Sequence, residues 1–545
     1  MVSNRLAAQA CTLEANSTQV CAYQCLENEA LRSFRDLLRL PVPYRLPSVC
    51  AFATRFRIGP YDLSFVIGQL ILKVMTNDKS CMTAWYEGCL IEAGISMNSE
   101  GGMKPSSIQL SIQSGAAALF LFVIAWLTAL PARARANPIA DWDVIAFEAV
   151  KASGKAGPVT ACDVAMAHLA MHDALNAIDR RYEPYAYDAA APRGASPEAA
   201  VAAAAHGVLI VRIPNQKASL DAALASALAA IPDGRAKTDG VGAGRMAAAA
   251  ILARRADDGS DIVRSYKPGA VLGVWRPTPP AFAKAVGVSF GKVKPFTMSN
   301  SAQFELPRPA YFNLGSAEYA ADYNEVKSLG GADSKTRTAE QSEIARFWYE
   351  PSPGVHIRLA RDLAVTRKLN LWDSARLFAL LHLASADCLI TGYGVKYRYK
   401  FWRPVTSIHY GAYDGNPQTV ADPTWNSYLE TPSHPEYPSL HAVLCAAWAE
   451  ILARYFGTDR FSFTMTSAKP YPGITRSFKS FSQSAQESAD SRVYAGVHFR
   501  SSSRDGLVIG RKIGAQVFDK FLQPTPDVPL RYGIFENSIA ASVVR

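Results

Sequence analysis

Apolar residues recur at helical spacing along most of the chain after residue 140, and strand-like alternation is scarce. Glycine and proline breaks, such as Gly154–Pro158, divide this pattern into separate helices. The segments predicted to be helical are 141–153, 159–178, 196–230, 240–257, 337–350, 355–368, 372–400, 440–457, 483–495 and 505–522. Turn-rich residues in 264–320 and 410–437 predict irregular connections. The expected fold class is therefore all-α, with one large or two fused helical bundles.

A different pattern marks residues 103–136. The segment begins with Met103 and the basic residue Lys104, and an apolar run follows at 115–130. It ends with an Ala-x-Ala site at Ala134-Arg135-Ala136. This order is typical of a secretory signal peptide cleaved after Ala136. The alternative is a transmembrane helix, but the apolar run is shorter than the roughly 20 residues that a span needs.

A signal peptide belongs at an N-terminus, so we expect residues 1–102 to be a leader that is absent from the mature protein. The alternative is a genuine N-terminal module followed by a membrane anchor. The rest divides into an N-terminal helical half (137–330), a C-terminal helical half (331–523) and a tail (524–545). This organisation predicts a secreted or periplasmic protein with no stable membrane span after cleavage.

Composition narrows the classes of partner. The 57 basic and 47 acidic residues give a formal net charge of +10, but no run of five or six Lys or Arg occurs. The excess of basic residues therefore favours a small anionic ligand, and it is too dispersed to form a basic segment that binds nucleic acid. Three cysteines follow residue 136, namely Cys162, Cys388 and Cys445. Each lies in an apolar run, so we expect buried thiols with no disulfide framework.

Three clusters carry candidate chemistry. Lys396 and Arg403 are seven residues apart, which predicts one face of a helix that ends before Pro404. Two cations on one helix face can bind an oxyanion, although this pair taken alone is more typical of a basic face exposed to solvent. Ser439 is placed as the N-cap of the next helix, with His441 beside it, so its free N–H groups favour an anion.

The third cluster contains Arg492 and His498. Six residues separate them, so they converge only if the helix ends near Gly496. Each of the three clusters is weak alone. Four other histidines lie on helical runs, and for these we expect structural roles: His168, His172, His206 and His382.

In this order, Lys-x6-Arg-Pro, Pro-Ser-x-His and Ser-Arg-x5-His resemble the signature of the vanadium-dependent haloperoxidases and the type 2 phosphatidic acid phosphatase superfamily. The resemblance covers about residues 138–523 and includes Phe-Trp-Arg-Pro at 401–404 and His-Pro-Glu-Tyr-Pro-Ser at 434–439. The haloperoxidase branch fits better, because its Lys-to-Arg spacing and its long helical N-terminal half are both present. The family fold is a pair of helical bundles.

The resemblance implies a set of groups that hold vanadate. Lys396, Arg403 and Arg492 resemble the cations on the equatorial oxygens, while Ser439 and the backbone N–H of residue 440 resemble further donors. Phosphate shares this shape and charge and would occupy the same site. Leu440 departs from the family, which usually has glycine there. We expect its side chain to shift the donor or to crowd peroxide and halide, because glycine allows close approach.

The histidines complete the implied chemistry. His498 resembles the axial ligand of vanadium, and His441 resembles the acid–base group where hydrogen peroxide enters. His434 lies at the position on the halide side, where a histidine resembles the bromoperoxidases, so bromide or iodide is the expected halide. Ser502 stands where some members carry an aspartate, four residues after the metal-binding histidine.

The expected function is oxidation of halide by hydrogen peroxide to hypohalous acid, which then reacts with a small organic acceptor. Two alternatives stay open on the same site. One is an acid phosphatase in which His498 is the nucleophile and His441 protonates the leaving group. The other is a non-catalytic relative that only binds an oxyanion. The sequence leaves the oligomeric state open.

Overall fold

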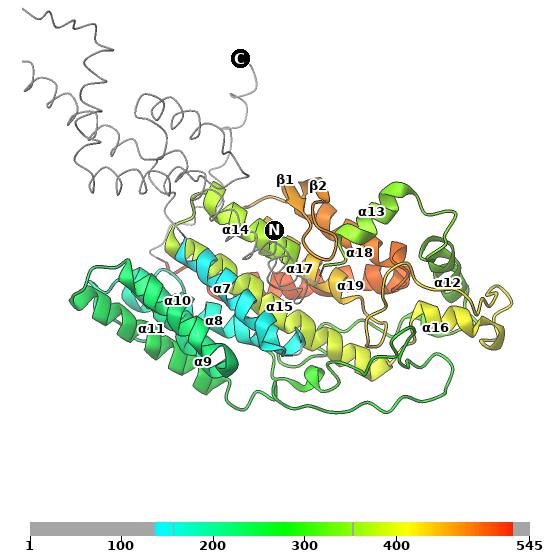
Figure 1. Ribbon diagram of the computed structural model, residues 1–545, viewed down its shortest axis with the longest axis horizontal. Helices are drawn as coiled ribbons and strands as arrows, with labels where there is room; N and C mark the ends of the chain where they lie inside the picture. The colour runs from blue at the N-terminus through cyan, green and yellow to red at the C-terminus, as the bar shows by residue number, and fades with distance from the viewer. Residues whose placement is uncertain (1–136, 156, 351–353, 527–545) are drawn as a thin grey trace, which may run out of the picture. The chain divides into compact units, whose positions relative to one another are not determined.

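The computed structural model describes residues 137–155, 157–350 and 354–526 (Figure 1). The predicted leader and signal peptide lie outside these residues, as does most of the tail. The described part is helical, as predicted, with one short hairpin. Its helices and strands are α7 (Pro138–Ser153), α8 (Gly157–Ile178), α9 (Pro197–Arg212), α10 (Lys217–Ala229), α11 (Arg235–Arg254), α12 (Ala317–Leu329), α13 (Ala339–Phe347), α14 (Gly354–Thr366), α15 (Leu371–Tyr399), α16 (Pro404–His409), α17 (Leu440–Tyr455), β1 (Arg460–Thr466), β2 (Thr475–Ser480), α18 (Phe481–Tyr494) and α19 (Arg500–Lys520).

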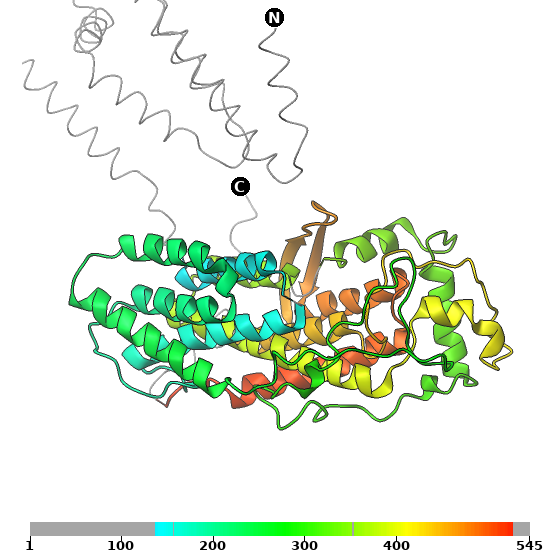
Figure 2. The same cartoon turned by 60° about the horizontal axis from the view of Figure 1, so that its bottom comes forward.

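Two predictions from periodicity were wrong. The single helix expected over 196–230 is interrupted at Ile213, and Pro214–Gln216 form a 3-10 turn before α10 begins. Pro214 explains the break, because proline has no N–H and disfavours helix at the residue before it. The β1–β2 hairpin, which stands out from the helices in Figure 2, was not predicted. Its alternating side chains are mostly half-buried on one face.

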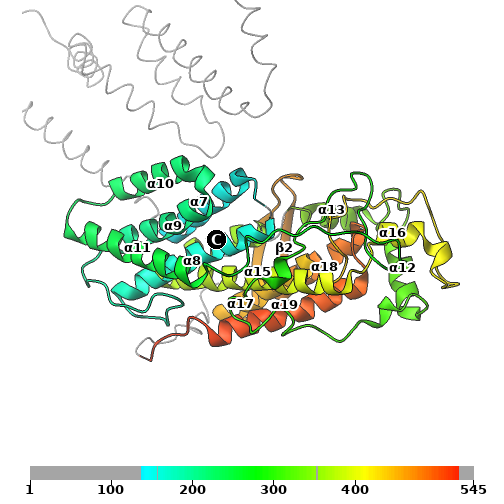
Figure 3. The same cartoon turned by 90° about the horizontal axis from the view of Figure 1, so that it is seen from below.

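Helix α15 runs through the middle of the described unit, beside α8, α17 and α19 (Figure 3). It is long and apolar enough to cross a membrane, but 89% of its most apolar window is buried, as in the core helix of a globular bundle. Glycines let α19 approach α17 closely. A Cβ atom at Gly510 would lie 2.1 Å from the Val443 carbonyl oxygen. This contact fixes α17 and hence the start of that helix.

A buried carboxylate joins four helices. Asp143 Oδ1 on α7 accepts hydrogen bonds from His168 Nε2 on α8 at 3.0 Å and from His382 Nε2 on α15 at 2.9 Å. Asp143 Oδ2 accepts from Arg361 Nε on α14 at 2.7 Å. Burial lowers the pKa of His168 to about 4, so its ring is neutral at pH 7. These contacts give both histidines structural partners, as predicted. The three cysteines of the described chain, Cys162, Cys388 and Cys445, are also buried thiols, as predicted.

Candidate functional site

The site is assembled from the ends of helices α15, α17 and α18 and from the loops beside them. The sequence analysis placed Lys396 and Arg403 on one helix face, and this was wrong. Helix α15 ends at Tyr399, Lys400 adopts a left-handed conformation (φ 54°, ψ 33°), and Arg403 is the N-cap residue of α16. The two cations therefore approach the same region from two different elements. Both are fully buried, and Arg492 is 1% exposed.

Lys396 binds the loop that precedes α17. Its ammonium group donates hydrogen bonds to the carbonyl oxygens of Pro435, Glu436 and Pro438 at 2.8, 2.9 and 2.7 Å. All three N–H groups of the lysine thus have acceptors on this loop. Burial, with a smaller contribution from Arg403, lowers the pKa of Lys396 well below its usual range. In this structure the lysine holds the loop in place.

Arg403 connects two histidines. Its Nε donates to the His434 carbonyl at 2.9 Å, and a terminal nitrogen donates to His434 Nδ1 at 3.0 Å. The other terminal nitrogen donates to His498 Nε2 at 3.1 Å and to the Val497 carbonyl at 2.6 Å. Burial lowers the pKa of Arg403 to about 10, so the guanidinium stays charged at neutral pH.

His498 is held as a neutral ring with a defined tautomer. Helix α18 ends at Tyr494 and Gly496 adopts φ 78°, which confirms the expected turn between Arg492 and His498. His498 Nδ1 donates to Glu436 Oε1 at 2.9 Å, while Nε2 accepts from Arg403. Burial lowers the pKa of His498 well below its usual value. An unprotonated Nε2 is the form required of a metal ligand or a nucleophile.

Glu436 was missed by the sequence analysis. It is fully buried and accepts hydrogen bonds from His498 Nδ1, from the Phe499 N–H at 3.1 Å and from the Tyr311 hydroxyl at 3.0 Å. Burial raises its pKa to about 7. The sequence signal was present, because this is the only carboxylate between His434 and His441. We had sought the acid after His498, where Ser502 Oγ lies 3.4 Å from Nδ1.

Among the eleven buried side-chain polar atoms that have no hydrogen-bond partner in the described structure, three belong to predicted site residues: Ser439 Oγ, His441 Nε2 and Arg492 Nε. Ser439 is the N-cap residue of α17, as predicted, but its hydroxyl makes no capping bond. The first N–H groups of an α-helix also lack intrahelical acceptors. Unpaired buried polar atoms are costly. His441 and Arg492 line the same cavity, and Ser439 is two residues before His441 at the start of α17, so together they indicate a ligand. A hydroxyl, a guanidinium and a helix N-terminus together suit a tetrahedral oxyanion, and the residues present therefore fit vanadate or phosphate.

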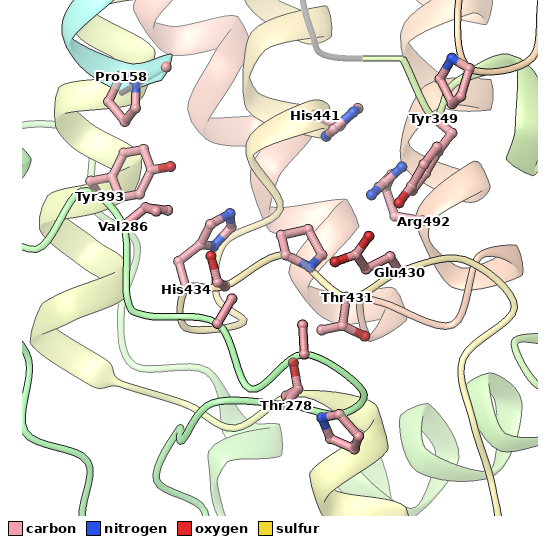
Figure 4. A pocket seen from close by; sticks show the side chains of 17 residues that line it. Pro158, Thr278, Val286, Tyr349, Tyr393, Glu430, Thr431, His434, His441 and Arg492 are labelled. Atoms are coloured by element: carbon pink, nitrogen blue, oxygen red, sulfur yellow. The ribbon is translucent and has the colours of Figure 1, made fainter. Parts of the chain in front are cut away.

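Of these donors, Arg492 lines a cavity of about 550 Å³ (Figure 4). His434, His441 and Arg492 line it, and Tyr393 lies across from Arg492. The Tyr393 ring meets His434 edge-on, with centroids 5.4 Å apart. Burial is the main cause that lowers the pKa of both His434 and His441 well below the usual value. The predicted halide-side residue and acid–base residue thus share one cavity wall as neutral rings.

Leu440 is not among the residues that line this cavity, so the expected crowding is not seen there, while the expected shift of the backbone donor stays a prediction. It is the first residue of α17, is 7% exposed and is not among the residues that line the cavity. Its side chain packs against α15 at Gly392, where an added Cβ would lie 2.2 Å from Leu440 Cδ2. The glycine that the family carries in this motif is therefore replaced here by a leucine, with a glycine opposite it.

Comparisons with known proteins agree with this geometry. A family model described as the VCPO second helical-bundle domain matches residues 376–526, which include every predicted site residue. Vanadium chloroperoxidase from Curvularia inaequalis is 29% identical over 259 residues, or 35% of this chain. The match spans 42% of that relative's length.

Solved structures extend the likeness. A bacterial vanadium-dependent iodoperoxidase is 26% identical, with a TM-score of 0.63 over 70% of this chain and 97% of that protein. The holo form of a bacterial vanadium-dependent chloroperoxidase has a TM-score of 0.54 at 19% identity, over 71% of this chain and 93% of that one, and it shows the shared fold alone. The resemblance to the vanadium-dependent haloperoxidases is therefore confirmed, and so is the helical-bundle fold.

Substitution of Ser439 distinguishes a role in binding the ligand from a role in folding, because its hydroxyl has no hydrogen-bond partner among the described residues. Ser439→Ala removes no hydrogen bond, so the free energy of unfolding should change by less than about 0.5 kcal/mol in urea titrations. Vanadate affinity, measured by isothermal titration, should fall about tenfold, or ~1.4 kcal/mol. Ser484→Ala is the matched control, because its buried hydroxyl donates to the Phe481 carbonyl at 2.7 Å far from the cavity. It should lose about 1 kcal/mol of stability and no affinity. A stability loss in Ser439→Ala with unchanged affinity would contradict the assignment.

The Gly392–Leu440 contact predicts non-additive substitutions. Gly392→Ala should destabilise the fold by about 1–3 kcal/mol through overpacking and weaken vanadate binding, because Leu440 must move with the start of α17. Leu440→Ala removes the clash, so the double variant should be at least about 1 kcal/mol more stable than the sum of the single changes. Gly242→Ala is the control, since nothing lies within 4 Å of that added Cβ. If the changes in the free energy of unfolding of the two single variants add up to the change in the double variant, residues 392 and 440 do not interact.

Proposed function

We propose that the chain is a vanadate-dependent haloperoxidase that uses hydrogen peroxide to oxidise bromide or iodide to hypohalous acid. The observation that carries the proposal is that His434, His441 and Arg492 line one cavity and that His441 Nε2, Arg492 Nε and the nearby Ser439 Oγ have no partners among the described residues. Arg403 links His434 of this cavity to His498. When bound, vanadate would act as a Lewis acid that activates peroxide without a change of oxidation state. The net reaction consumes peroxide, halide and one proton, and it yields hypohalous acid and water.

In this proposal some residues contact the oxyanion directly and others hold those residues in position. His498 presents an unprotonated Nε2 because Glu436 accepts its Nδ1 proton. Arg492 and Ser439, with the N–H of Leu440 at the start of α17, supply donors for the oxygens. Arg403 fixes the ring of His498, and Lys396 fixes the loop that delivers Ser439. Both also contribute positive charge to the site.

His441 is the acid–base group of this proposal. Its ring is neutral, since burial lowers its pKa, and Nε2 has no partner among the described residues. It can accept the proton of incoming hydrogen peroxide and return it to the water that leaves, which requires a base that is unprotonated at the working pH.

His434 supports bromide or iodide over chloride. Arg403 donates to His434 Nδ1, so the neutral ring carries its proton on Nε2, and the ring forms part of the cavity wall. A neutral N–H beside the Tyr393 ring is a weakly polar environment that suits a large, poorly hydrated halide. The iodoperoxidase likeness is compatible with this preference. The proposal retains a secreted or periplasmic location.

One observation favours a second candidate function. The unprotonated His498 Nε2 beside the Arg403 guanidinium is also the arrangement of a nucleophile facing a phosphate ester. A phosphatase would use His441 to protonate the leaving group, and phosphate would occupy the same donors.

One assay on the full chain separates the candidates. Protein loaded with vanadate should form triiodide or tribromide from peroxide and the halide, measured by absorbance. His498→Ala should lower this rate at least about 100-fold, because it removes the predicted metal ligand. His206→Ala is the control, since that ring pairs with Asp221 on another helix and should retain activity.

The other outcomes overturn the proposal in distinct ways. Release of phosphate from an aryl phosphate without vanadate, and no trihalide, would support the phosphatase. Vanadate binding by isothermal titration with neither activity would support a non-catalytic oxyanion-binding protein.

A further inference from the structure

We propose that the cavity above the oxyanion donors binds the organic acceptor, and that this acceptor is an uncharged, electron-rich aromatic molecule such as a phenol. Halogenation would then take place inside the cavity, before hypohalous acid reaches bulk water. The inference rests on the proposed function, because the halogenating species must form at the same site.

The cavity is too large for peroxide and halide alone. Its volume is about 550 Å³, whereas a water molecule in the liquid occupies about 30 Å³, and peroxide and a halide ion are each of similar order. Cavities of roughly 300–1,000 Å³ are typical of sites for organic ligands. Space for a one- or two-ring molecule therefore remains beside the oxyanion donors.

The walls differ in chemistry from side to side. Pro158, Val286 and Tyr393 form one side, and Glu430 and Thr431 lie on the opposite side (Figure 4). The apolar side suits the face of an aromatic ring, with Tyr393 available for an edge or offset contact. The polar side offers acceptors for a phenolic O–H. This two-sided arrangement fits a molecule with one apolar ring system and one hydroxyl.

Charge excludes the ionic acceptors. Arg492 is the one Lys or Arg among the described residues that line the cavity, and the oxyanion already requires it. An anionic acceptor would find no second cation and would face Glu430. A cationic acceptor would be attracted by Glu430, which is exposed, but it would be repelled by Arg492 in the cavity wall and by the buried charges of Lys396 and Arg403.

The entrance is apolar and accessible. Ala281, Ala283 and Val286 line the cavity, and Val286 is 37% exposed. Phe282 lies between the two alanines and is 63% exposed. An apolar molecule would bury this surface when it enters, which is favourable. Ala281 and Ala283 are also exposed, so larger side chains fit there without disturbing the core.

The chemical step balances without a further reagent. The O–X bond of hypohalous acid breaks, an aromatic carbon forms the C–X bond, and its C–H proton combines with the departing hydroxide to give water. The ring carbon is oxidised and the halogen is reduced from the formal +1 state. Hydrogen peroxide from the proposed function is the only oxidant.

The test measures acceptor binding separately from halide oxidation, with 1-naphthol as the probe. Isothermal titration of 1-naphthol into the vanadate-loaded full chain should show one site, and Ala283→Trp should weaken it at least tenfold. Ala225→Trp is the control, because Ala225 is exposed in the middle of α10 and outside the cavity. With peroxide and bromide, the ratio of 2-bromo to 4-bromo product should differ at least about threefold from that given by added hypobromous acid.

Two results would overturn the inference while leaving the proposed function intact. One is normal tribromide formation with no 1-naphthol binding, or with binding that Ala283→Trp leaves unchanged. The other is a product ratio equal to that of free hypobromous acid. Absence of both tribromide and triiodide in the wild type without acceptor would instead refute the proposed function on which the inference rests.

Discussion

The burial of three cations in one small region is the constraint on which the site depends. Lys396, Arg403 and Arg492 have no more than 1% of their surface exposed, and Glu436 is the carboxylate that faces the first two. A buried ion that lacks partners costs several kcal/mol. The chain meets part of this cost with carbonyl oxygens of the loop at 434–438 and of Val497. Arg492 Nε still has no hydrogen-bond acceptor among the described residues, which indicates that an anion binds there.

Burial, together with the same three cations, determines the protonation state of the histidines. Burial, reinforced by the cations, lowers the pKa values of His434, His441 and His498, so all three rings are neutral at pH 7. Neutral imidazoles can bind a metal, accept a proton or contact a halide, and charged ones cannot perform the first two roles. Glu436 then selects one tautomer of His498. The same burial therefore leaves the donors without partners and the histidines unprotonated.

Much of this could be predicted from the sequence. Helical periodicity placed α17 and α19 within a few residues, and Gly496 correctly predicted the turn that brings Arg492 and His498 together. The tertiary contacts of the site residues were harder to predict from the sequence. Nothing in local spacing shows that Leu440 packs on Gly392 of another helix, or that Lys396 donates to the loop before Ser439. Such contacts depend on how segments far apart in the chain pack against one another.

Thermal unfolding of the full chain over a range of vanadate concentrations tests the central claim most directly. An oxyanion that binds only the folded state stabilises it by RT ln(1 + [L]/Kd). The melting temperature should therefore rise continuously with the logarithm of vanadate concentration, and Arg492→Leu should abolish the rise. A melting temperature that does not change with vanadate, or that rises equally in Arg492→Leu, would contradict the account that these buried cations form an oxyanion site.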